Sequence, residues 1–304
     1  MVAPREKISI GNIQKNQMIH KYYKVGGHCF SVEADETVFS HMADYEPFLV
    51  NEASELVFTV TVTMAKHVDF EYTEVARSNI DTLTTISGED ANGQDVYEYF
   101  WCGQTLFWLV CDKQYRHGEL TLTGVQMKMS LDFAITNIYR YATLKLMTAA
   151  IHASAVSYKG RAYLFLGISG TGKSTHSRLW LKYFEGTELI NDDKPILRVM
   201  ENGEVRLYGS PWSGKTPCYR NVEYPVGGMV KLNQAPHNKI RRLGKVETYY
   251  VILQSVYGKR WDKAVSTLLH DYETKLVELV PMWHLECLPD QAAAELSKKT
   301  VTGE

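Results

Sequence analysis

The chain has 304 residues, of which 45% are hydrophobic and 22% are charged, and its formal net charge is −2. This composition is typical of globular proteins, and it excludes extensive disorder and a nucleic-acid binder that depends on a broad basic surface. No apolar run approaches the roughly 18 residues of a membrane span, and the start "MVAPREKISIG" has no apolar signal core. We therefore expect a cytoplasmic protein that does not enter the membrane.

Residues 1–129 are predicted to form a β-rich domain. Short runs of β-branched and aromatic residues, such as "ELVFTVTVT", "VYEYFW" and "TLFWLVCD", alternate with turn clusters such as "SGEDANGQD". The apolar spacing then changes to that of a helix over residues 130–151, with Ser130 as a candidate N-cap. We place a domain boundary at the start of this helix. Binding of a substrate or partner is assigned to the first domain.

Residues 130–304 are predicted to form an α+β domain with a mixed β-sheet. Two strands flank a turn at Lys159-Gly160, a helix over residues 173–184 follows, and the Asn202-Gly203 pair indicates a hairpin. Hairpins beside a strand–loop–helix unit argue against a purely parallel sheet. Further on, residues 244–258 and 260–273 look helical, residues 275–286 look extended, and residues 289–299 form a final helix.

Two strings match the phosphate-loop pattern G-x-x-x-x-G-K-[ST], "GISGTGKS" at residues 167–174 and "GSPWSGKT" at residues 209–216. The first follows an apolar strand and opens a helix, so its backbone N–H groups and the helix N-terminus can hold phosphates. The nucleotide-binding residues predicted from it are Gly167, Ser169, Gly170, Thr171, Gly172, Lys173, Ser174 and Thr175. Lys173 would reach the β- and γ-phosphates, and Ser174 would bind Mg²⁺.

The second string lacks this context. Pro211 and Trp212 stand where bare backbone is needed, and Pro217 disfavours helical geometry at the preceding residue. A chance match is the better explanation, although Lys215 and Trp212 remain candidates for a substrate loop, as a point charge and a stacking wall.

An acidic pair and a histidine complete the set of candidate residues. Asp192 and Asp193 end the strand that follows the loop helix, where one carboxylate can accept a hydroxyl proton and the other can orient Mg²⁺. A solvated turn before Pro195 is the competing interpretation. His152 precedes the strand pair, and a lone histidine is more often structural than catalytic.

Residues 152–195, with His152, the loop and the Asp192-Asp193 pair at similar spacings, resemble the catalytic core of HPr kinase/phosphorylase and the wider phosphoenolpyruvate-carboxykinase-like group. The resemblance implies a twisted mixed sheet with flanking helices. It also implies active-site roles for His152 and Lys173, Mg²⁺ binding by Ser174, and proton transfer by Asp193. The family's Glu-, Arg- and Gly-rich signature is missing, and residues 209–221 stand in its place, as in HPr-kinase-related proteins.

Three functions remain open at this point. The first is an ATP- and Mg²⁺-dependent kinase that phosphorylates a hydroxyl of a small molecule, peptide or protein, with His152, Lys173, Asp192 and Asp193 as its catalytic residues. The second is a nucleotide-dependent lyase of the carboxykinase type. The third is a non-catalytic module that senses nucleotide or recruits a partner. The loop does not distinguish ATP from GTP or pyrophosphate, and a homo-oligomer is compatible with the resemblance.

Overall fold

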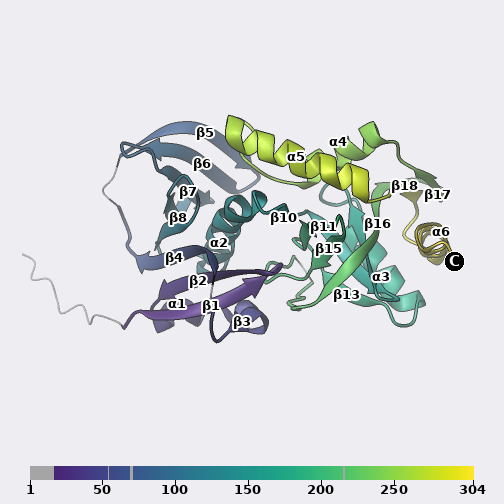
Figure 1. The fold of residues 1–304 in the computed structure, drawn as a ribbon, viewed down its shortest axis with the longest axis horizontal. Coiled ribbons are helices and arrows are strands. Elements are labelled where there is room, and N and C mark those ends of the chain that lie inside the picture. Colours follow the sequence, from purple (N-terminus) through teal and green to yellow (C-terminus); the bar gives the residue numbers. More distant parts are fainter. Residues whose placement is uncertain (1–16, 54, 69–70, 215) are drawn as a thin grey trace, which may run out of the picture.

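Two large β-sheets lie beside each other along the long axis of the molecule, with a long helix between them (Figure 1). This is the arrangement of a computed structural model that describes residues 17–53, 55–68, 71–214 and 216–304. The protein is therefore an α+β protein with large mixed sheets, which confirms the predicted class.

The first sheet has nine strands in the order β3-β1-β2-β4-β9-β8-β7-β6-β5. Its strands are β1 (Ile19–Val25), β2 (His28–Ala34), β3 (Leu49–Val50), β4 (Leu56–Met64), β5 (Tyr72–Ile80), β6 (Leu83–Asp90), β7 (Asp95–Trp101), β8 (Gln104–Cys111) and β9 (His117–Leu122). A short helix α1 (Glu36–Phe39) and a 3₁₀ turn η1 (Ala43–Phe48) connect β2 to β3. The strand β4 runs parallel to β2 and β9, whereas β5 to β9 form an antiparallel meander.

The second sheet also has nine strands, and β16 is central to it. A continuous path β10-β14-β15-β16-β12-β11-β13 is extended by β18, which pairs with β16, and by β17, which pairs with β18. The bounds are β10 (Thr148–Ala150), β11 (Ala153–Tyr158), β12 (Arg161–Leu166), β13 (Glu188–Asn191), β14 (Ile196–Val199), β15 (Val205–Tyr208), β16 (Glu223–Gln234), β17 (Lys239–Arg242) and β18 (Met282–Cys287). The strands β12, β16 and β18 are parallel and the remaining pairs are antiparallel, so the sheet is mixed as predicted.

Helices cover both faces of this second sheet, because its strands alternate their apolar side chains. Tyr163 and Phe165 of β12 pack with Trp180 under α3 (Lys173–Tyr183) and α6 (Gln291–Thr302). Leu164 and Leu166 belong to the core on the other face, together with residues of α4 (Lys245–Ser255) and α5 (Lys263–Leu279). Successive side chains of a strand point to opposite faces of the sheet, so a strand that is buried on both faces contributes apolar side chains to both cores.

The helix between the sheets, α2, spans Met127–Leu144, so both predicted ends were wrong. Ser130 is not the N-cap; it lies within the first turn, where its hydroxyl donates to the Val125 carbonyl at 2.9 Å, and Gln126 precedes the helix in a left-handed conformation. The helix stops because Met147 adopts a φ of 53° and turns the chain into β10.

The region predicted as extended over residues 275–286 was also partly wrong. Helix α5 continues to Leu279, because Leu269, Tyr272 and Leu276 place apolar side chains on one buried face at spacings of three and four residues. Only the segment after Pro281 is a strand.

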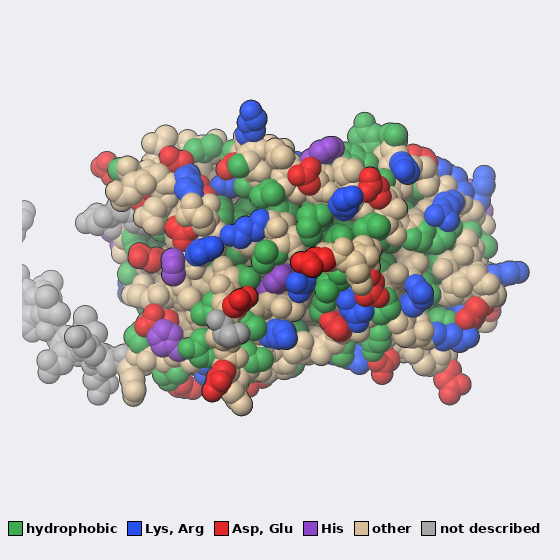
Figure 2. All heavy atoms as spheres, in the orientation of Figure 1, with side chains coloured by type: hydrophobic (Ala, Val, Ile, Leu, Met, Phe, Trp, Pro, Cys, Tyr) green, Lys and Arg blue, Asp and Glu red, His purple; other side chains and the backbone are tan. Residues whose placement is uncertain are grey.

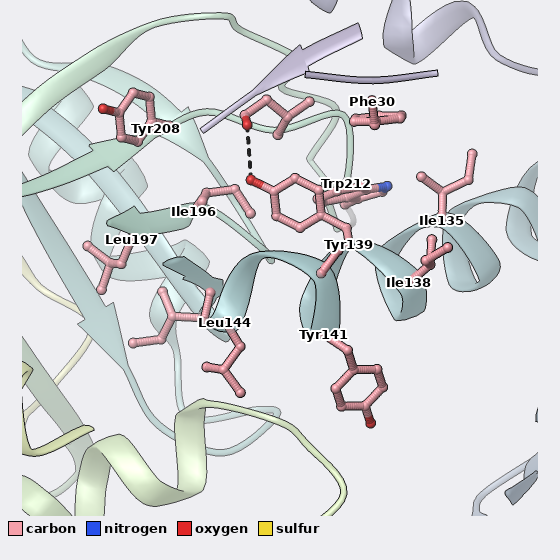
Figure 3. Packing of buried hydrophobic residues seen from close by; sticks show 14 of the residues in the cluster. Phe30, Ile135, Ile138, Tyr139, Tyr141, Leu144, Ile196, Leu197, Tyr208 and Trp212 are labelled. Carbon is pink, nitrogen blue, oxygen red and sulfur yellow. Dashed lines mark hydrogen bonds between the residues drawn. The ribbon is translucent and has the colours of Figure 1, made fainter. Parts of the chain in front are cut away.

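One apolar core joins the two sheets through α2 (Figure 3). The Tyr139 ring lies 6.3 Å from Phe30 of the first sheet and 5.1 Å from Trp212 beside the second, measured between ring centroids, and its hydroxyl donates to the Val25 carbonyl at 3.0 Å. The predicted boundary between residues 129 and 130 falls inside the first turn of this shared helix. The division into 1–129 and 130–304 stays a prediction.

Figure 2 shows acidic and basic side chains interspersed over the viewed face, in keeping with the small net charge. Over the described ranges, no helix is both long and apolar enough to cross a bilayer.

Candidate functional site

Strand order brings the predicted site residues to one edge of the second sheet. The strand β11 lies between β12 and β13 and is antiparallel to both, with Ala153 opposite Leu166 and Ala155 opposite Asn191. The carboxyl ends of β12 and β13 therefore lie at the same edge as the start of β11. That edge carries His152, the glycine loop after β12, and the acidic pair after β13.

The segment Gly167–Ser174, here called the phosphate loop, has the geometry that its glycines predict. Gly167 and Gly172 have φ angles of 149° and 101°, which side chains rarely permit, and a Cβ on Gly167 would lie 2.5 Å from the Thr171 hydroxyl. Helix α3 begins at Lys173 immediately after the loop. The predicted nucleotide-binding residues all lie in this loop or in the first turn of α3, so free N–H groups gather at its N-terminus.

Lys173 is buried and folds over its own loop. Its ammonium group donates to the carbonyl oxygens of Gly167 at 2.8 Å and Ile168 at 3.1 Å. Burial lowers the pKa of Lys173, while the negative charges of Asp193 and Asp192 oppose that shift. The cation therefore lies within the field of both aspartates at the mouth of the loop.

His152 and Asp193 form a close pair, with 3.0 Å between His152 Nδ1 and Asp193 Oδ1. A carboxylate can only accept, so the proton of a neutral imidazole lies on Nδ1 in this contact. Burial alone raises the pKa of Asp193, but the hydrogen bond from His152 and the charges of Lys194 and Lys173 outweigh it and hold the pKa below its ordinary value. Asp193 is therefore ionised at neutral pH, and His152 orients it.

Asp192 differs from its neighbour, since it is only 8% exposed and both carboxylate oxygens lack a hydrogen-bond partner among the residues that the structure describes. Buried carboxylates are costly without a partner, so this group is suited to a cation. No cluster of three or more His, Cys, Asp or Glu residues in the described chain could hold a metal ion by itself.

Asn191 was missed by sequence reasoning, and it fixes the acidic pair in place. Its buried side-chain oxygen accepts from the backbone N–H groups of Asp193 at 2.9 Å and Lys194 at 2.8 Å. Its amide nitrogen donates to the Ser210 hydroxyl at 3.1 Å and the Trp212 carbonyl at 3.2 Å. The string "NDDKP" holds the signal, because Asn commonly bonds to the backbone two and three residues ahead in a turn.

The 209–216 loop, the second match to the pattern, connects β15 to β16 and, where it is described, leads into no helix. It packs directly on the acidic pair: a Cβ on Gly214 would lie 2.9 Å from the Asp192 carbonyl oxygen and 3.2 Å from Asp193 Cβ. The Trp212 ring is buried in the core, and its indole N–H donates to the Tyr45 hydroxyl at 2.8 Å. The ring anchors this loop and offers no exposed stacking wall. Lys215 lies outside the described residues.

Two cavities flank the phosphate loop. A cleft of about 780 Å³ holds His152, Gly167–Thr171, Lys231 and Tyr257 in its wall, together with the turn residues Ile80 and Asp81 of the first sheet. A second cavity of about 650 Å³ adjoins the cleft and shares Thr171, Leu232 and Gln234 with it. Its wall includes Thr171, Gly172, Thr175, Leu179, Leu288 and Pro289.

No protein-family model matches this sequence, and no curated protein is similar to it at a significant level.

Proposed function

We propose that the protein is an ATP- and Mg²⁺-dependent kinase that transfers a phosphoryl group to a hydroxyl. One observation carries the proposal: the phosphate loop with Lys173, the ionised Asp193 held by His152, and Asp192, whose carboxylate has no hydrogen-bond partner among the described residues, meet at one sheet edge. The resemblance to HPr-kinase-related proteins and their carboxykinase-like fold supports the same conclusion.

Nucleotide binding is assigned to the phosphate loop and the two cavities beside it. The loop N–H groups and Lys173 would hold the phosphates of ATP. The cavity beside Thr175 and Leu179 adjoins the first turns of α3 and does not include His152, so it would receive the base. The γ-phosphate would then point into the cleft that contains His152.

Asp192 and Ser174 would hold Mg²⁺ jointly with phosphate oxygens, and the ion would supply charge neutralisation on the phosphates. Ser174 lies in the first turn of α3, directly after Lys173. The chemistry assigned to the remaining residues requires no other resident group.

Transfer is assigned to the His152–Asp193 pair. The acceptor oxygen forms a bond to the γ-phosphorus, the bond from that phosphorus to the β,γ-bridging oxygen breaks, and ADP leaves. Asp193 accepts the proton of the acceptor hydroxyl, because it is ionised and contacts His152, which lines the cleft. His152 orients this carboxylate and contacts the transferred group, and Lys173 stabilises the charge on it.

Calorimetric titration with ATP and Mg²⁺, followed by a transfer assay with labelled ATP, tests the proposal. Lys173→Ala is expected to abolish ATP binding, whereas Asp193→Asn is expected to retain binding and to lose transfer, because only the proton acceptor is removed. Full transfer activity in Asp193→Asn would contradict the assigned base. Absence of ATP binding by the unaltered protein would overturn the function itself.

A further inference from the structure

The strand β5 is an open edge of the first sheet. It is the last strand in the order, it pairs with β6 alone in the described sheet, and its side chains are exposed on both faces. Val75 is 57% exposed and Ile80 is 64% exposed. A long exposed edge strand usually carries a protecting device, because its free N–H and C=O groups can pair with another chain.

A β-bulge disrupts only the first part of the β5 edge. The pairing register with β6 shifts between Glu74 and Ala76, which indicates a bulge, but pairing is regular from Ala76 to Ile80. These five residues extend for about 17 Å. The nearby charges of Glu74 and Arg77 neutralise each other at 2.6 Å. The segment Ala76–Ile80 therefore offers a regular edge whose one charged side chain, Arg77, is paired with Glu74.

This edge leads into the cleft of the candidate site. Ile80 and Asp81, at the end of β5, line the same cavity as His152 and the phosphate loop. Two other exposed apolar side chains, Ile168 at 72% and Tyr257 at 52%, line that cavity as well. We name Ile80, Ile168 and Tyr257 the apolar rim; they come from three separate segments around one cleft. Exposed apolar groups gathered in this way indicate a binding surface.

We propose that the phosphoryl acceptor is an extended peptide segment that adds a strand to the Ala76–Ile80 edge. Its hydroxyl residue enters the cleft beside His152, the cleft-lining member of the His152–Asp193 pair, and an apolar neighbour packs on the apolar rim. Main-chain hydrogen bonds would supply affinity, and the rim would supply specificity. The inference rests on the proposed kinase function and names its class of substrate.

Continuity of the edge with the cleft favours this occupant over others. A small hydroxylated molecule would fill the cleft and leave β5 uncovered. A second copy of the chain, paired edge to edge through β5, would cover the strand but would place no hydroxyl beside Asp193. A peptide strand would both pair with the β5 edge and place a hydroxyl in the candidate site.

A backbone variant tests the strand pairing. Ile80 and Leu83 flank a two-residue turn, so they form the hydrogen-bonded pair, and the next pair, Asn79 and Thr84, turns its backbone groups outward. Asn79→Pro removes an outward N–H without removing a backbone bond to β6, and Asn79→Ala controls for the lost side-chain bond from the Thr84 hydroxyl at 2.8 Å. Glu71→Pro is the matched control, because Glu71 is exposed and precedes β5 at the end away from the cleft.

The assay uses labelled ATP, Mg²⁺ and a degenerate peptide library with one central serine or threonine. We expect transfer to peptides with an apolar residue next to the hydroxyl residue. For the best peptide, Asn79→Pro is expected to raise KM on the order of tenfold, and Glu71→Pro to leave it at the unaltered value. Ile80→Asp is expected to remove the apolar preference, whereas Val246→Asp, at an exposed apolar site outside the cleft wall, is expected to retain it.

The outcomes separate the two proposals. ATP binding with transfer to small hydroxyl compounds and to no peptide overturns the peptide inference while the kinase function stands. Peptide transfer that is equal in Asn79→Pro and Glu71→Pro overturns the strand addition. A dimer in light scattering that Asn79→Pro dissociates, with peptide KM unchanged, assigns the edge to a second copy instead. Absence of ATP binding removes the kinase function as well.

Discussion

His176 joins the helix that follows the phosphate loop to the last helix of the chain. It lies in the first turns of α3, is 2% exposed, and contacts the Ser297 hydroxyl of α6 through Nε2 at 2.9 Å. Trp180 donates to the same hydroxyl at 2.9 Å. The helix whose N-terminus would face phosphate is thus held from behind by the last helix of the chain.

Acid is therefore expected to weaken the fold at His176. Burial lowers its pKa from 6.5 to about 4, so between these values the unfolded chain binds a proton that the folded chain does not. The free energy of unfolding should fall as pH is lowered from 6.5 to 4, by about 3 kcal/mol at this residue. Urea unfolding at a series of pH values measures this slope.

His176→Gln is the matched variant, because its amide can still reach Ser297 and does not titrate. We expect a shallower slope in this window. The slope that remains is attributed to His28, whose pKa burial also lowers to about 4. Equal slopes for the two proteins would contradict the assignment.

At the scale of elements, the 209–216 loop carries a testable role. Gly214 touches the backbone of Asp192 and the side chain of Asp193, so an added methyl group must displace the acidic pair. Gly214→Ala is expected to lower kcat for transfer on the order of tenfold or more, since small displacements of reacting groups are costly, and to leave the Kd for ATP measured without Mg²⁺ nearly unchanged. Gly244→Ala is the control, because a Cβ there meets only ordinary contacts and φ is −75°. A loss of ATP affinity that equals the loss of kcat would argue against a local effect on Asp193.

The sequence predicted those elements whose signals are local. The strand–glycine–helix unit around Gly167 and the turn at Lys159-Gly160 are encoded within about 15 residues, and both form. The end of α5 was missed, because the pattern of "KLVEL" fits a strand or a helix, and only its burial against the core determines which one forms.

The candidate site likewise combines residues with local sequence signals and residues whose roles depend on distant contacts. Its loop and acidic pair could be located from spacing, whereas the role of Asn191 and the packing of Gly214 depend on a loop some 20 residues away.

At the scale of the whole molecule, the two sheets share their core and also an ion pair. Lys259, in the connection between α4 and α5, is 5% exposed, and its ammonium group lies 2.6 Å from Asp95 of the first sheet. Lys113 approaches the other oxygen of Asp95 at 2.9 Å. Separation of the sheets would therefore expose both apolar surface and a buried carboxylate.

We expect the chain to unfold in one cooperative transition for this reason. Urea titrations followed by tryptophan fluorescence and by far-ultraviolet circular dichroism should coincide. Trp101 and Trp108 report on the first sheet, and Trp180 and Trp283 on the second. Two separated transitions would instead support independent folding of residues 1–129 and 130–304.

The position of Lys173 has a consequence for the strength of nucleotide binding. In the structure its ammonium group already donates hydrogen bonds to two carbonyl oxygens of its own loop, which stabilise its charge. A bound triphosphate would replace these two hydrogen bonds of Lys173 with bonds to phosphate oxygen. The free energy of binding would therefore include the difference between the two sets of Lys173 hydrogen bonds. Such an exchange would favour a ligand with enough negative charge to replace the loop carbonyl oxygens as the partners of Lys173. A single phosphate would compete poorly with these carbonyl oxygens. On the proposed function, the loop would therefore discriminate against small anions and in favour of a polyphosphate.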